Sequence, residues 1–118
     1  MKEVSRAPGA GKLTGLLGIS RRAGRLTTGF DAVKGLIGEG KAALVMLASD
    51  LSEKTHKELR FAVGDKKIPI RHMPLTKEET GAACGLKKPV GVLATDDNGF
   101  AKAMETCCLH DLEEDSAI

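Results

Sequence analysis

The sequence predicts an α/β protein, a three-layer α/β/α sandwich with a four-stranded mixed central sheet. Along the chain, apolar residues at helical spacing alternate with short apolar runs of strand length. The run Ala42–Ala48 is apolar throughout, as expected of a strand that is covered on both faces. A length of 118 residues with 42% hydrophobic residues is enough to bury one core, so we expect a single domain.

The first expected elements are a helix, a short strand and a second helix. Apolar residues recur at helical spacing over residues 12–22, and Gly24 ends that helix. Residues 25–28 follow as a strand. Gly29 then leads into a second helix, which Gly38 ends. The buried side of this helix is expected to consist of Phe30, Val33 and Ile37.

After the apolar strand, the sequence predicts a third helix and a third strand. Ser52 is a suitable N-cap for the helix, and Gly64 ends it. Its apolar side is expected at Leu59, Ala62 and Val63. Residues 68–72 form the third strand, whose proline indicates a strand start or an edge position.

The last predicted elements are two helices around a fourth strand. Thr76 and Glu79 have the spacing of a capping box, which begins a short helix. Residues 90–95 are the fourth strand. Asp96 or Asp97 caps the final helix.

Charge is distributed unevenly along the chain. The net charge is +2, but residues 1–110 hold 18 basic residues against 12 acidic ones. We expect residues 1–11 to be a mobile N-terminal arm, residues 12–110 the folded domain, and residues 111–118 an acidic tail. The basic excess suits a phosphate backbone, but charge alone favours the simpler explanation, a solvated surface.

Several functional classes are disfavoured. No apolar run is long enough to span a membrane and the N-terminus does not resemble a signal peptide, so a cytoplasmic location without a membrane partner is expected. Cys84, Cys107 and Cys108 are too few and too badly spaced for a disulfide framework. Cys107, Cys108 and His110 have no second ligand pair at zinc spacing, so we expect no metal and no cofactor.

Catalytic residues are also not indicated. No nucleophile–base pair stands out, and His56 is expected in solvent, opposite the apolar side of its helix. Asp96 and Asp97 follow a strand, where two carboxylates more often cap a helix than bind magnesium. We therefore predict that the protein is not an enzyme.

The most informative constellation is basic. Arg21, Arg22 and Arg25 surround the turn after the first helix, and arginine binds phosphates through paired hydrogen bonds. Lys34 and Lys41 follow nearby. The start of the second helix presents unpaired N–H groups and a positive dipole end, where phosphate binds well. With no Trp, no Tyr and only three Phe, extended stacking platforms for single strands are not expected.

Four segments resemble a known family. Residues 28–35 (Thr-Gly-Phe-Asp-Ala-Val-Lys-Gly), the strand at 44–50, residues 81–85 (Gly-Ala-Ala-Cys-Gly) and the strand at 90–95 are similar to the ribosomal protein family L-seven-Ae/L-thirty-e. Residues 16–26 and 97–102 resemble its bacterial, ribosome-associated branch. The resemblance implies a non-catalytic protein that binds structured RNA, often a kink-turn, with ribosomal RNA and the ribosome as expected partners.

The kink-turn binders of this family share the signature Gly-x-Asn-Glu-x-x-Lys. Gly29 matches it, whereas Asp31, Ala32 and Gly35 stand where the signature has Asn, Glu and Lys. An ionised Asp only accepts hydrogen bonds and repels phosphate, and Ala accepts none. Lys34 comes one residue early, which turns it about 100° around the helix. We therefore expect contacts mainly to phosphates rather than kink-turn specificity.

The family's second RNA element is the loop before the last strand, here residues 86–90 with two lysines. A protein-interaction module that kept the fold is the alternative function, and a small-molecule sensor is a more distant one. The residues expected to contact RNA are Arg21, Arg22, Arg25, Gly29, Phe30, Asp31, Lys34, Lys41, Leu86, Lys87 and Lys88.

Overall fold

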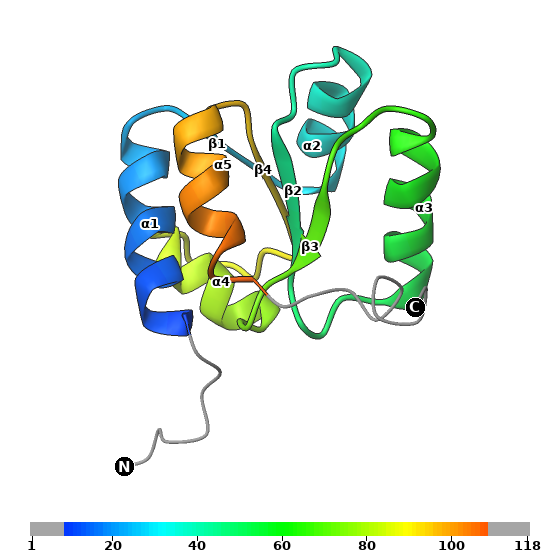
Figure 1. The fold of residues 1–118 in the computed structure, drawn as a ribbon. Coiled ribbons are helices and arrows are strands. Elements are labelled where there is room, and N and C mark those ends of the chain that lie inside the picture. Colours follow the sequence, from blue (N-terminus) through cyan, green and yellow to red (C-terminus); the bar gives the residue numbers. More distant parts are fainter. Residues whose placement is uncertain (1–8, 109–118) are drawn as a thin grey trace, which may run out of the picture.

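The structure is a computed structural model that describes residues 9–108. Helices and strands alternate along this part of the chain (Figure 1). The helices are α1 (Ala10–Arg22), α2 (Phe30–Gly38), α3 (Glu53–Val63), α4 (Lys77–Ala83) and α5 (Asn98–Glu105). The strands are β1 (Leu26–Thr28), β2 (Leu44–Leu47), β3 (Ile70–His72) and β4 (Val92–Thr95).

The four strands form one mixed sheet in the order β1-β4-β2-β3. β4 runs antiparallel to both of its neighbours, and β3 runs parallel to β2. β1, β2 and β3 therefore end on the side of the sheet where β4 begins. We call this the loop end, because the loop at residues 85–91 leads into β4 there. The opposite ends of the strands form the far end.

The sheet separates two hydrophobic cores (Figure 1). Leu44 and Met46 point to the face that α1, α4 and α5 cover, whereas Val45 and Leu47 point to the face under α2 and α3. All four side chains are fully buried. This alternation within one apolar strand is why β2 carries no polar residue, since both faces of the strand are covered.

The predicted three-layer sandwich is confirmed, and so are the predicted caps of α3, α4 and α5. The hydroxyl of Ser52 accepts a hydrogen bond from the Thr55 N–H, as an N-cap does. Thr76 and Glu79 form both bonds of the capping box. Of the two candidate caps of α5, Asp97 is the one that accepts from the Phe100 N–H, at 2.8 Å.

The element boundaries differ from the prediction by up to two residues at several ends. The helix α1 begins at Ala10, which is buried at 1% exposure, so residues 10 and 11 belong to the folded domain rather than to the predicted arm. Ala10 packs into the core beneath α1, and that contact extends the helix towards the N-terminus. Residues 1–8, and the predicted acidic tail at 111–118, lie outside the described residues.

Candidate nucleic-acid interface

The start of α2 lies at the loop end of the sheet. Gly29 precedes the helix with φ 99° and ψ 150°, a conformation that residues with a β-carbon avoid. Its N–H donates to the Val92 carbonyl at 2.9 Å, which fixes the helix start against β4. No side chain of the described residues caps α2. Its first-turn N–H groups therefore have no capping side chain among the described residues, and exposed Asp31 lies in the same turn.

The loop at 85–91 folds back along α4. The N–H of Leu86 donates to the Gly81 carbonyl at 2.9 Å, and the N–H of Val90 donates to the Lys77 carbonyl at 2.9 Å. A β-carbon on Gly81 would overlap the Lys88 carbonyl oxygen, so only glycine permits this close approach. Leu86 is half-buried against the core under α1. The loop backbone is thus held in place while Lys87 and Lys88 remain exposed.

Arg21 joins α1 to the start of this loop. Its Nη1 donates to the Cys84 carbonyl at 3.0 Å, where Cys84 caps the C-terminus of α4. A cation near the end of a helix also interacts favourably with the helix dipole. Despite this contact, Arg21 is an exposed residue. Arg22, the next residue, is also exposed, and its guanidinium lies beside Gly18 on α1.

The loop therefore connects two parts of the predicted site. It starts at Cys84, which Arg21 contacts, and it ends at Val92, which contacts Gly29. We call the surface along this path the loop-end surface. It comprises the exposed residues Arg21, Asp31, Lys87 and Lys88 and the half-buried residues Gly29, Phe30 and Leu86.

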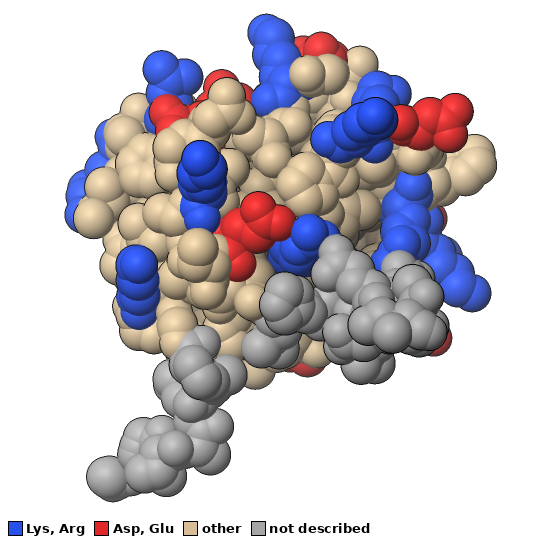
Figure 2. All heavy atoms as spheres, viewed as in Figure 1, with Lys and Arg blue, Asp and Glu red and all other residues tan. Residues whose placement is uncertain are grey.

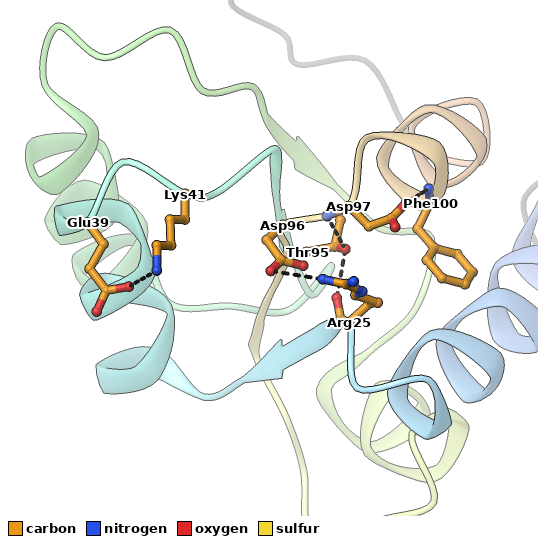
Figure 3. Close-up of polar contacts among 7 residues, drawn as sticks. All are labelled: Arg25, Glu39, Lys41, Thr95, Asp96, Asp97 and Phe100. Atoms are coloured by element: carbon orange, nitrogen blue, oxygen red, sulfur yellow. Dashed lines mark hydrogen bonds and ion pairs between the residues drawn. The ribbon is translucent and has the colours of Figure 1, made fainter.

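Two other predicted residues lie at the far end (Figure 3). The Arg25 guanidinium is 3.6 Å from the Asp96 carboxylate, and the Lys41 ammonium is 3.8 Å from that of Glu39. Both pairs are largely exposed, so each stabilises the fold by at most about 1 kcal/mol. Buried Thr95 organises this end, because its hydroxyl donates to the Arg25 carbonyl at 2.7 Å and accepts from the Asp97 N–H at 3.2 Å.

Lys34 lies in the other helical layer. Its ammonium is 5.5 Å from the centre of the Phe30 ring, within the range of a cation–π contact. The same lysine lines a groove of about 700 Å³ between α2 and α3, which we call the α2–α3 groove. The residues that line it are Lys34, Lys57, Glu58, Phe61 and Ala62.

The basic residues consequently do not form the single cluster that the sequence suggested. Arg21 and Lys34 lie on opposite sides of the sheet, because α1 and α2 cover different faces. On the face shown in Figure 2, lysines and arginines are separated by neutral surface and by acidic groups. The contacts among the described residues link Arg21 to the start of the loop and Gly29 to its end, whereas Arg25 and Lys41 lie at the far end.

Some relevant residues were not singled out from the sequence. Phe61 is 89% exposed, although its position off the apolar side of α3 was a readable signal. His56, expected in solvent, is half-buried, and its ring lies edge-on to that of His72 with centres 5.0 Å apart. The Nε of Arg60 donates to His56 Nε2 at 3.2 Å. No sequence pattern relates His56 on α3 to His72 on β3.

The cysteines are part of the packing. Cys84 and Cys107 are buried and Cys108 is half-buried, and none of them forms a disulfide. Burial raises the pKa of Cys84 despite the nearby Arg21 guanidinium. Burial, with the neighbouring Cys107 and Glu105, raises the pKa of Cys108 to about 12. His110 lies outside the described residues.

Residues 9–108 contain neither a candidate metal site nor a helix suited to span a membrane. Within this range, His, Cys, Asp and Glu side chains form no group of three that could hold a metal ion. None of the helices in the same range combines the length and the apolar character that crossing a membrane requires.

Comparisons with known proteins agree with this architecture. The family model of the "Ribosomal protein L7Ae/L30e/S12e/Gadd45 family" matches residues 11–105. A protein named RNA-binding protein YlxQ from Enterococcus faecium is 34% identical over 91 residues, which is 77% of this chain and 85% of that protein. The large ribosomal subunit protein eL30 of Methanocaldococcus jannaschii is 34% identical over 68 residues, 58% of this chain and 60% of that protein.

The fold has a solved counterpart of similar extent. A structure of a protein of unknown function from Bacillus halodurans superposes with a TM-score of 0.75 at 30% identity, covering 81% of this chain and 95% of that one. The family match spans most of the described residues, including the start of α2 and the loop at residues 85–91. The chain therefore belongs to the ribosomal protein L7Ae/L30e/S12e/Gadd45 family.

Proposed function

We propose that this protein is a non-catalytic RNA-binding protein that binds structured RNA on the ribosome, with ribosomal RNA as its target. The family assignment and the printed names of the relatives, an RNA-binding protein and a ribosomal protein, support RNA as the class of ligand. A ribosomal target in turn implies a cytoplasmic location.

The observation that carries the proposal is the loop-end surface. Arg21, Lys87 and Lys88 supply positive charge along a path that leads to the N-terminus of α2, which has no side-chain cap among the described residues. Guanidinium, ammonium and backbone N–H groups are donors suited to phosphate oxygens. RNA helices are recognised largely through shape and phosphate contacts, which fits a surface with few groups that read bases.

Arg22, Arg25, Lys34 and Lys41 extend this proposal beyond the loop-end surface. Arg25 and Lys41 are exposed at the far end, and their ion pairs are weak enough to exchange for phosphates. We propose that they contact the RNA backbone where it continues past the sheet. Asp31, Ala32 and Gly35 leave the kink-turn signature incomplete, so we propose binding to structured RNA without kink-turn preference.

Titration of the full chain with three probes tests this function. A ribosomal RNA fragment, a kink-turn RNA and a mononucleotide are compared by gel shift at several salt concentrations, together with co-sedimentation on ribosomal subunits. We expect comparable affinity for the two RNAs, a steep salt dependence and no affinity for the mononucleotide. Absence of RNA binding at low salt would favour the protein-interaction alternative, which the three replaced signature positions motivate.

A further inference from the structure

The α2–α3 groove combines features that the loop-end surface does not have. Phe61 on α3 is 89% exposed, and it lines a groove that Lys34 and Lys57 also line. The helices α2 and α3 lie side by side over the same face of the sheet (Figure 1). The volume of about 700 Å³ falls in the range that holds a small molecule or one nucleotide.

Lys34, which lines the groove, also contacts the first residue of α2. Lys34 lies over the ring of Phe30, the first residue of the helix, at 5.5 Å. An RNA strand bound at the N-terminus of α2 therefore reaches the groove within about one helical turn, roughly 5 Å along the axis. This proximity links the groove to the loop-end surface.

We propose that an unpaired nucleotide of the bound RNA occupies the α2–α3 groove, with its base stacked on Phe61 and its phosphates on Lys34 and Lys57. The proposal rests on the function proposed above and adds a second contact to it. An exposed aromatic ring can stack on the flat base of a nucleotide, and lysine side chains in the same groove can bind its phosphates. Glu58 accepts hydrogen bonds only, which suits a base amino group or a ribose hydroxyl.

The shortage of aromatic residues is consistent with this single contact. With three Phe in the chain, an extended platform for consecutive bases is excluded, but one stacked base needs one ring. Phe61 contributes little to the core, because nine-tenths of it is exposed. A large apolar ring in that position has no evident purpose in folding.

Two matched RNAs test the proposal. One is a hairpin with an unpaired uridine extension, and the other is the same hairpin without it. We expect Phe61→Ala to lower affinity for the extended hairpin about tenfold or more, and to leave affinity for the blunt hairpin within about twofold. Phe61→Tyr keeps the ring and should restore the affinity. A bromouridine in the extension should crosslink to the unaltered protein and not to Phe61→Ala.

Ile19→Ala is the control, because Ile19 is 50% exposed on α1 in the other helical layer. This variant should bind both hairpins as the unaltered protein does. Equal affinity of Phe61→Ala and the unaltered protein for the extended hairpin would overturn the stacking proposal. So would an equal loss on both hairpins. If the unaltered protein binds neither hairpin, the proposed RNA-binding function itself fails, and the stacking proposal fails with it.

Discussion

Gly81 on α4 lies so close to the carbonyl oxygen of Lys88 that a β-carbon on the glycine would overlap that oxygen. Gly81→Ala must therefore displace the loop or the helix, and we expect it to lower the free energy of unfolding by about 1–3 kcal/mol or more. Denaturant unfolding followed by circular dichroism measures the change.

The matched control is Gly15→Ala on the exposed side of α1, where an added β-carbon meets nothing within 4 Å. Alanine favours the helix there, and a stabilisation of about 0.5–1 kcal/mol is expected. A Gly81→Ala protein as stable as the unaltered one would show that the loop adjusts freely. It would also mean that the loop does not hold Lys87 and Lys88 in a fixed position.

Thr95 and Thr80 are both buried, but only Thr95 has hydrogen-bond partners for its hydroxyl among the described residues. Thr95→Val leaves the Arg25 carbonyl and the Asp97 N–H without this partner, so we expect a loss of about 1–3 kcal/mol of stability. Thr80→Val removes a buried hydroxyl that has no such partner, and it should be neutral or stabilising. Thermal melting of the two variants checks the contrast, and equal destabilisation would contradict it.

Removing charge from the interface should change both the affinity for RNA and its salt dependence. Arg21→Gln and Arg25→Gln are each expected to weaken binding and to reduce the slope of log affinity against log salt by about one. Lys12→Gln, at an exposed position in the first turn of α1, is the control and should leave the slope unchanged. An unchanged slope for Arg21→Gln would exclude that residue from the interface.

Lys41→Gln measures how far the interface extends across the sheet. Lys41 is paired with Glu39 at the far end, so we expect its removal to weaken RNA binding less than the removal of Arg21 does. The measurement is the same salt titration. An effect of Lys41→Gln as large as that of Arg21→Gln would contradict this prediction and show that the RNA contacts Lys41 as closely as it contacts Arg21.

Asp31, Ala32 and Gly35 can be replaced together to restore the kink-turn signature. Because Asn both donates and accepts and Glu accepts from base amino groups, Asp31→Asn, Ala32→Glu and Gly35→Lys together should create a preference for kink-turn RNA. All three positions are exposed, so the fold should tolerate them. Competition between a kink-turn RNA and a fully paired RNA of equal length measures the preference, and its absence would mean that other residues set specificity.

The pKa of Cys108 predicts a loss of stability in alkali. Burial raises this pKa to about 12, whereas the unfolded thiol keeps a value near 9.0. Below pH 9 both states are protonated and the thiol has no effect on pH dependence. Above it the unfolded state binds fewer protons, so stability falls as the pH rises towards 12. Unfolding measured across this window should show a shallower decline for Cys108→Ala, and identical profiles would contradict the prediction.

Much of the fold is predictable because its signals are local. Helical spacing, the capping box at Thr76 and the apolar run of β2 each depend on residues that are close in sequence. The strand order β1-β4-β2-β3 depends on residues far apart in sequence. So does the assignment of residues to the loop end or the far end, which follows from that order. The start of α1 was placed late because the burial of Ala10 depends on packing against the core.

The candidate site was predictable to a lesser degree. The start of α2 at Gly29 follows from a glycine before an apolar helix, and the structure has it there. The separation of Arg21 from Lys34 depends on which face of the sheet each helix covers, and proximity in sequence conceals it. The contact of Arg21 with Cys84 joins residues 63 positions apart, so no motif indicates it.

The two outermost strands, β1 and β3, are only three residues long. An added strand from another chain would find few unpaired backbone groups there, and Pro69, just before β3, offers no N–H. Such short edge strands offer a neighbouring copy few backbone groups for pairing. A high local concentration of the protein should therefore not make the sheets of different copies join edge to edge.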